Sequence, residues 1–308
     1  MKKYTKISVY KVITDQVIKG LKKEGLSWFK PWTNNDGEFV VPMSLKSGKQ
    51  YQGINVLLLS AQMRANEWTR PEFITYKQAE ELGGNVIKGQ AGSEVIYWMV
   101  SYFVGKKWFA NERALNKAGY KKTCKGVTAN WSPRYFRVFN VEQCEGLKLT
   151  EATKPTQESI FVAIPDAELV FKGYNVPPNL SHGGNRAYYK PSIDAVKMPK
   201  AEAFVTTDDY YKTLFHELVH STGHDTRLKR KGVTGINSFG SKDYSFEELI
   251  AEIGAMFLVA FTGINPKDAD TNSQAYINGW ISKLEAEEKW ILQASGAAER
   301  AVKYILNK

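Results

Sequence analysis

The sequence predicts an α+β protein of two domains, because it contains both helix-like and strand-like segments and its charge changes between the halves. Its 308 residues are enough for two domains that each bury a core. Residues 1–150 hold 24 Lys and Arg against 12 Asp and Glu, whereas residues 151–308 hold 18 against 20. Six of the eight tryptophans also lie in the first half. This asymmetry indicates two domains with different partners, the first of which binds a polyanion.

The first half predicts a small α+β domain. Apolar residues recur at helical spacing up to Gly25, which is expected to end the first helix. Thr75 and Gln78 form a capping box for a later helix, which a Gly-Gly pair closes. Aromatic and β-branched residues predict strands. In order, these are a helix at 9–24, an aromatic loop at 26–32, a buried helix within 47–62, a helix within 75–84, and strands within 93–109 and 134–141.

The second half predicts a mixed sheet edge followed by helices. A polar stretch at 146–159 that carries Pro155 is expected to be the linker, so the predicted domains are 1–148 and 158–308. The predicted elements are short strands at 159–165 and 167–173, followed by helices at 209–222, 245–262 and 273–306.

Composition also limits the setting of the protein. No apolar run approaches the length of a membrane span, and the first residues lack the apolar core of a signal peptide. Cys124 and Cys144 do not form a CxxC pair, so neither a disulfide framework nor a cysteine zinc site is expected. We therefore expect a cytoplasmic protein with no membrane partner.

An HExxH motif at residues 216–220 predicts a zinc site. On a helix, His216 and His220 lie one turn apart, so both imidazoles can bind one Zn²⁺ ion. Glu217 lies beside the metal, where it can take a proton from an attacking water as the catalytic base. The alternative is an ordinary helix with two incidental histidines. Three of the four histidines fall within nine residues, which favours the metal site.

The third protein ligand is expected from a later acidic helix. The pattern HExxHxxGxxH requires a third histidine at position 226, which is Thr226, so the metzincin arrangement is rejected. Glu248 and Glu252 are four residues apart and share a helix face. We favour Glu248 as the metal ligand and Glu252 as the group that orients a ligand histidine, with the reverse assignment left open. Ser245 and Glu248 also fit a capping box, which needs no metal.

Basic and aromatic residues alternate in the first half, as single-stranded nucleic acid binding requires. Cations follow the phosphates while rings stack on unpaired bases. The alternative is that most rings are core and the lysines only keep the protein soluble, and we assign Tyr97 and Trp98 to the core. Composition alone does not separate single strands from duplex or RNA. The residues expected to bind the nucleic acid are Trp28, Lys30, Trp32, Lys49, Tyr51, Trp68, Arg70 and Lys77.

The chain resembles the ArdC-type antirestriction proteins of conjugative plasmids and mobile elements along nearly its whole length. In the first half the resemblance rests on residues 15–32, 51–59, 73–98 and 135–147, and in the second on residues 186–199, 210–230, 244–258 and 276–285. It implies an N-terminal domain that binds single-stranded DNA, a C-terminal zincin-like metallopeptidase domain, and a role in shielding incoming plasmid DNA from host restriction. His216, Glu217 and His220 match the family's zinc motif directly, whereas the acidic helix matches only as a block.

Two hypotheses about function follow. In the first, the protein binds single-stranded DNA and its zinc domain cleaves a restriction-related or DNA-bound host protein. In the second, the zinc is purely structural or binds a partner, and the protein only coats incoming single-stranded DNA. The presence of Glu217 favours the first, because a structural zinc site does not need this carboxylate.

Overall fold

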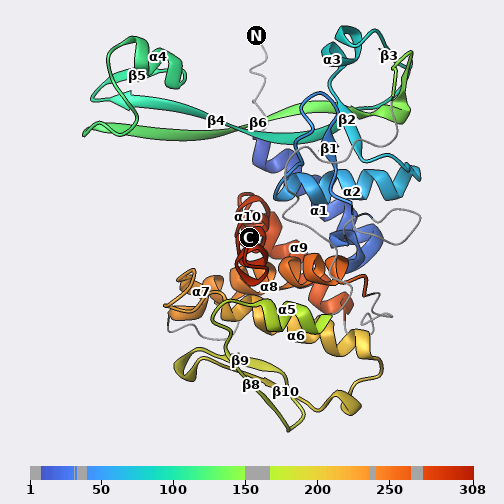
Figure 1. Cartoon of the computed structure of the whole chain (residues 1–308), viewed down its shortest axis with the longest axis vertical. Coiled ribbons are helices and arrows are strands. Elements are labelled where there is room, and N and C mark those ends of the chain that lie inside the picture. Colours follow the sequence, from blue (N-terminus) through green and yellow to red (C-terminus); the bar gives the residue numbers. More distant parts are fainter. Residues whose placement is uncertain (1–7, 31, 33–39, 150–166, 236–240, 265–272) are drawn as a thin grey trace.

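A layer of helices lies between two separate regions of sheet in the computed structural model (Figure 1). The structure describes residues 8–30, 32, 40–149, 167–235, 241–264 and 273–308. The larger sheet belongs to the first half of the chain and lies at one end of the long axis. The smaller sheet belongs to the second half and lies at the other end. The predicted mixture of helices and strands is confirmed.

Two predicted helix boundaries in the first half are confirmed. The first helix ends at Gly25, whose φ of 59° is readily adopted only by glycine and whose backbone N–H bonds to the carbonyl of Leu21. Thr75 and Gln78 form the reciprocal capping box. The helices are α1 (Val9–Glu24), α2 (Ile54–Asn66), α3 (Tyr76–Glu81) and α4 (Glu112–Lys117), with a 3₁₀ turn η1 at Gly25–Phe29.

The sheet of the first half is dominated by one long antiparallel pair. β4 and β6 pair over twelve positions, from Ser93 opposite Val138 to Val104 opposite Val127, so the second strand begins seven residues before the predicted start at 134. Beyond α1 and α2 this pair continues outward and carries α4 and β5 at its tip (Figure 1). The strand order is β1 (Met43–Ser44), β2 (Glu72–Ile74), β6 (Val127–Asn140), β4 (Ser93–Val104) and β5 (Lys107–Phe109), with β3 (Asn85–Val86) and β7 (Cys144–Glu145) paired separately.

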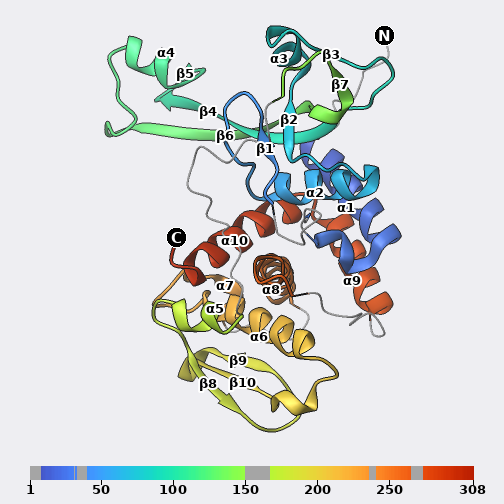
Figure 2. The ribbon, with the colours of Figure 1, turned by 45° about the vertical axis from the view of Figure 1, so that its right-hand side comes forward.

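The second half places one helix between its sheet and its other helices. α6 contacts β9 and β10 on one side and α8 on the other, and Figure 2 shows this layering. The sheet has the order β8 (Asn179–His182), β10 (Ala195–Met198) and β9 (Tyr188–Lys190). The helices are α5 (Ala167–Gly173), α6 (Thr207–Ser221), α7 (Lys231–Thr234), α8 (Lys242–Phe261), α9 (Ser273–Ala286) and α10 (Trp290–Ile305).

Three predictions for the second half are wrong. Residues 167–173 form α5 rather than a strand, because Ala167, Val170 and Tyr174 are buried at helical spacing. The helix expected at 273–306 is divided into α9 and α10. α8 begins at Lys242, so Ser245 is buried within the helix and cannot start a capping box. The strand predicted at 159–165 and most of the predicted linker lie outside the described residues.

The two halves share a hydrophobic core instead of burying fully separate ones. One buried cluster joins Val17 and Leu57 of the first half to Phe257 and Ile291 of the second. α1 packs on α9, and α2 packs on α10. A smaller cluster around Phe73 belongs to the first half alone. The boundary predicted at residues 148–158 stays a prediction, because residues 150–166 are not described.

The remaining sequence predictions concern membranes and cysteines. Among the described helices, none combines the length and apolar character needed to cross a bilayer. Cys124 and Cys144 are both free thiols.

Candidate metal centre

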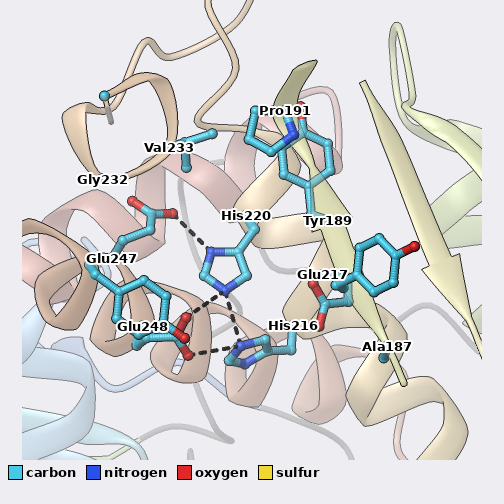
Figure 3. A pocket seen from close by; sticks show the side chains of 13 residues that line it. Ala187, Tyr189, Pro191, His216, Glu217, His220, Gly232, Val233, Glu247 and Glu248 are labelled. Carbon is cyan, nitrogen blue, oxygen red and sulfur yellow. Dashed lines mark hydrogen bonds and ion pairs between the residues drawn. The ribbon is translucent and has the colours of Figure 1, made fainter. Parts of the chain in front are cut away.

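Helix α6 carries the HExxH motif and is fixed at its start by Thr206. The Thr206 hydroxyl accepts a hydrogen bond from the backbone N–H of Asp209 at 3.1 Å, so Thr206 caps the helix. Leu214, Leu218 and Val219 are buried and hold the helix in the core. His216 and His220 consequently face the cavity from successive turns of the helix (Figure 3).

Helix α8 approaches α6 closely enough to bring carboxylates to these histidines. A Cβ on Gly254 of α8 would lie 2.8 Å from a methyl group of Val219 on α6, so only glycine permits this spacing. Gly232 likewise lets α7 approach α8, because a Cβ there would lie 2.5 Å from the Cβ of Glu247. The glycines therefore set the distances on which the site depends.

Three side chains form a triangle of the right size for a metal ion. The Nε2 atoms of His216 and His220 are 3.1 Å apart, and carboxylate oxygens of Glu248 lie 3.6 Å and 3.4 Å from them. Zinc bonds of 2.0–2.2 Å in tetrahedral geometry separate ligand atoms by about 3.4 Å. The donor set and the edges of the triangle therefore fit a divalent metal, and Figure 3 shows the three groups converging on one point.

Each histidine uses its other ring nitrogen to contact a second carboxylate. The Nδ1 of His216 lies 3.5 Å from Glu252, the contact that the sequence reasoning assigned to this residue. The Nδ1 of His220 lies 3.2 Å from Glu247. Such carboxylates fix the tautomer and the orientation of ligand histidines, so Nε2 is left to face the metal in both rings.

Glu247 is the member of the site that sequence reasoning did not assign. Its carboxylate is bound at 2.6 Å and 2.8 Å by Arg230, which also donates to the Thr222 hydroxyl and the Val219 carbonyl at the end of α6. Arg230 thus joins the two helices through their polar groups. The sequence did contain a clue, because Arg230 lies only ten residues after His220. The HExxH pattern does not include that position.

The charges of the site are strongly coupled. Burial opposes the charge on His216, but its hydrogen bonds with Glu248 and Glu252 prevail and raise its pKa to about 10. Burial likewise opposes the charge on His220, and its bonds to Glu247 and Glu248 raise its pKa to about 9. Burial also opposes the charge on Glu248, but the two histidines lower its pKa. The pKa values of Glu247 and Glu248 are both lowered, so these two carboxylates stay ionised and stabilise positive charge, whether carried by protons or by a metal.

Glu217 and an edge strand complete the cavity, which has a volume of about 500 Å³. Glu217 is buried, and its carboxylate lies beside His216 on the side of Ala187 (Figure 3). Ala187, Tyr188 and Tyr189, from β9 and the residue before it, line the same cavity. The two histidines, the Glu217 carboxylate and the edge strand therefore line one cavity.

An ion pair holds β9 beside helix α6. Arg227 binds the carboxylate of Asp194 through two bonds of 2.8 Å and 2.7 Å and donates to the Ser221 carbonyl of α6. The Tyr189 hydroxyl donates to the same aspartate at 2.8 Å. The turn between β9 and β10 is consequently fixed to the end of α6.

Trp28 and Trp32 contradict the prediction that they are exposed DNA-binding rings. They are 4% and 6% exposed. The Trp28 indole lies against Gly20, where a Cβ would come within 2.0 Å of the ring, and Arg64 binds the Trp28 carbonyl at 3.1 Å. Trp32 packs with Phe73 in the smaller core. These rings stabilise the fold and are not available for stacking.

The other predicted DNA-binding residues do not form one surface. Tyr51 and Trp68 are half-buried with edge contacts to Phe73, and burial raises the pKa of Tyr51 to about 12. Arg70 binds the buried Glu72 at 2.8 Å. The Lys30 carbonyl accepts a bond from Arg64. Lys49 and Lys77 are exposed, on the turn after β1 and on α3.

Exposed aromatic residues lie instead on the β4–β6 pair. Tyr97 and Trp98, which the sequence reasoning placed in the core, are 61% and 40% exposed, so that prediction is wrong. Both lie in β4, and the Trp98 ring also meets that of Tyr10 on α1 at 6.4 Å. The period-2 pattern of β4 did not reveal this, because a core strand and a projecting strand can have the same composition.

The HExxH helix, the acidic helix and the edge strand have the arrangement of a zincin-like domain. Family models match the two halves of the chain separately. Residues 165–297 match the zincin-like metallopeptidase family, and residues 7–139 match the N-terminal domain of the anti-restriction factor ArdC.

Solved structures specify the family. The Mn(II)-bound crystal structure of the antirestriction protein ArdC from plasmid R388 is 30% identical, with a TM-score of 0.71 and 98% of each chain covered. The metal-free structure of that protein is 28% identical, with the same TM-score and 97% of each chain covered. The present chain belongs to the ArdC-type antirestriction family, as its motifs predicted.

Curated relatives extend the comparison to longer proteins. Two DNA primases named TraC from Escherichia coli are 34% and 33% identical over 96% of this chain. The chain spans 20% and 26% of their lengths. The uncharacterized protein y4eC of Sinorhizobium fredii (strain NBRC 101917 / NGR234) is 27% identical over 96% of this chain and 91% of its own length.

Proposed function

We propose that this protein is a single-stranded-DNA-binding antirestriction protein of mobile elements whose C-terminal domain is a zinc-dependent peptidase. The observation that carries the peptidase assignment is the triangle of His216, His220 and Glu248 with Glu217 at its side. DNA binding is supported by the net positive charge of the first half of the chain. The proposed protein substrate is a restriction-related or DNA-bound protein of the host.

In this proposal, His216, His220 and Glu248 hold the zinc ion. Bound zinc supplies Lewis acidity to the hydrolysis of the peptide bond. Glu252 and Glu247 hold the two imidazoles in orientation through Nδ1, and Arg230 keeps Glu247 ionised and in place.

Glu217 acts as the general base. Its carboxylate accepts a proton from the attacking water, and the same proton then passes to the leaving nitrogen of the peptide bond. Glu217 is 8% exposed and lines the cavity, so it is shielded from bulk water yet available to a substrate.

Strand β9 is the proposed docking edge for the peptide. It pairs with β10 on one side, and within the described residues its other edge has no partner strand. Residues of β9 line the cavity beside Glu217. An extended peptide that pairs with this edge presents its backbone to the catalytic carboxylate, as in β-strand addition elsewhere.

The competing function is a DNA coat with a structural metal, and two observations count against it. The metal-free and Mn(II)-bound structures of the R388 protein match this chain with equal TM-scores, which favours a metal that the fold does not require. Glu217 also has no role in a purely structural site.

Substitution of Glu217 by Gln separates the two functions. We expect Glu217→Gln to retain one metal ion per chain and single-stranded DNA binding, and to slow peptide cleavage by about 10²–10⁴-fold through loss of the base. New protein N-termini in an extract of a restricting host, counted by mass spectrometry, are the readout. Full protection of an incoming plasmid by Glu217→Gln, with no wild-type-specific N-termini, would instead establish the coating function.

A further inference from the structure

One segment of the first half projects from the rest of the molecule. We define the β4–β6 arm as residues 97–137, which comprise the outer part of β4, β5, α4 and most of β6. Figures 1 and 2 both show this pair of strands continuing past α1 and α2, with β5 and α4 at its tip. A projecting two-stranded ribbon has two faces that other molecules can reach.

The β4–β6 arm carries most of the excess positive charge of the first half. It holds nine of the 24 basic residues of residues 1–150 but only one of their 12 acidic residues, Glu112. Among the described residues, Lys122 pairs with Glu112 and Arg137 pairs with Glu94, while the other arm cations have no carboxylate partner. Those cations are Lys106, Lys107, Arg113, Lys117, Lys121, Lys125 and Arg134.

Exposed rings accompany these cations on both faces of the ribbon. Residues opposite one another in an antiparallel pair share a face. Tyr97 lies opposite Arg134, and its ring meets that of Phe136 edge-on at 6.1 Å. On the other face, Trp98 lies opposite Pro133, and Trp131 lies opposite Val100 two pairs further out. The large exposed residues of the arm are Tyr97, Trp98, Met99, Trp108, Trp131, Tyr135 and Phe136.

We propose that the β4–β6 arm is the surface on which single-stranded DNA binds. This inference rests on the DNA binding proposed above and locates it. The cations of the arm contact phosphates, and its rings stack on bases. The rings of Trp28 and Trp32 take no part, because they are buried.

The chemistry of the arm favours a single strand over other occupants. A protein partner would need an acidic surface to match the unpaired cations, whereas every nucleotide supplies a phosphate. A duplex offers phosphates but hides the faces of its bases, so it would leave exposed rings such as Trp131 and Tyr97 without stacking partners. Only an unpaired strand uses both features at each step.

The test measures binding of the full-length protein to a labelled oligo(dT) of about 20 nucleotides, by fluorescence anisotropy at several salt concentrations. Trp131→Ala and Tyr97→Ala should each raise Kd by at least about fivefold, because stacking on a base is lost. Arg134→Gln should flatten the plot of log Kd against log salt concentration by about 0.7, because one phosphate contact is lost. A residue that only supports the fold would not change that slope.

Matched controls lie outside the arm. Tyr76 on α3 is 53% exposed, and Tyr76→Ala removes an equivalent ring. Lys77→Gln and Lys49→Gln remove exposed cations that the sequence pattern had suggested. All three control proteins should bind the oligonucleotide as the wild type does. All substituted residues are exposed, so unchanged thermal midpoints are expected throughout.

Four results would overturn the proposal in distinguishable ways. If Lys49→Gln and Lys77→Gln weaken binding while the arm variants do not, single-stranded DNA binding stands but its location is wrong. If the wild type prefers a matched duplex, the occupant of the arm is a duplex. If the arm variants abolish self-association and leave DNA binding intact, the occupant is a second copy of the chain. If the wild type binds neither oligonucleotide, the proposed DNA binding and this inference both fail.

Discussion

The metal centre and the β4–β6 arm place charged groups in opposite environments. At the metal centre, His220 and Glu247 are nearly buried and each charge has a nearby partner. On the arm, cations such as Lys107 and Arg134 are exposed and have no carboxylate partner among the described residues. Buried charges are stable only when they are paired, whereas exposed cations remain available for an external polyanion. The buried, paired charges therefore suit the proposed chemistry at the metal centre. The exposed, unpaired cations suit the proposed binding of DNA by the arm.

The largest effect should come from replacing a buried tryptophan and an exposed tryptophan by alanine and comparing the two losses of stability. Trp28→Ala should lower the free energy of unfolding by about 3–5 kcal/mol, because Trp28 is 4% exposed in the main core. Trp131→Ala should change it by less than about 0.5 kcal/mol, because Trp131 is 60% exposed. Urea unfolding followed by circular dichroism gives both values. Equal losses in the two variants would show that the arm is part of the core and would remove the contrast.

Glu247→Gln tests how far the metal centre depends on its partnered carboxylates. We expect a 10–100-fold loss of metal affinity, because Glu247 orients His220 and the neutral amide holds the ring less firmly. Titration with zinc against a competing chelator measures this loss. Glu285→Gln is the matched control, since Glu285 is exposed on α9 and pairs with Lys22 at the long distance of 3.9 Å. If the two variants bind zinc equally well, Glu247 has no part in the site.

The sequence was informative where one residue type can meet a local geometric requirement. The spacing of His216 and His220 places them on one helix face in any amphipathic helix, and the glycine at position 25 ends α1 through its positive φ. The exposure of Tyr97 and the burial of Trp28 depend on which elements pack beside them. Burial of Trp28 requires Gly20 on α1 and Arg64 on α2, which are eight and 36 residues away in the sequence. No local pattern contains that information.

The same limit explains the assignment of the acidic helix. Glu247, Glu248 and Glu252 all lie within one segment, and their roles follow from how α8 packs on α6 at the close approach that Gly254 permits. The sequence preference for Glu248 as the ligand agrees with the triangle in the structure, and Glu252 lies at Nδ1 of His216. The ligand set remains part of the proposed function, which the Glu217→Gln and Glu247→Gln variants examine from two sides.

The smallest effects should come from removing one helix cap in each region, and they should show whether the two regions unfold together. Thr206 caps α6 and Asn111 caps α4, each by accepting one backbone N–H. Thr206→Ala should lower the global free energy of unfolding by about 1 kcal/mol, because α6 is packed between the sheet and α8. Asn111→Ala removes an equivalent bond from a short helix at the tip of the arm, where local fraying precedes global unfolding. We therefore expect faster amide hydrogen exchange within α4 and an unchanged global midpoint. A lowered global midpoint for Asn111→Ala would mean that the arm unfolds together with the core, and the arm could then not act as an independent binding element.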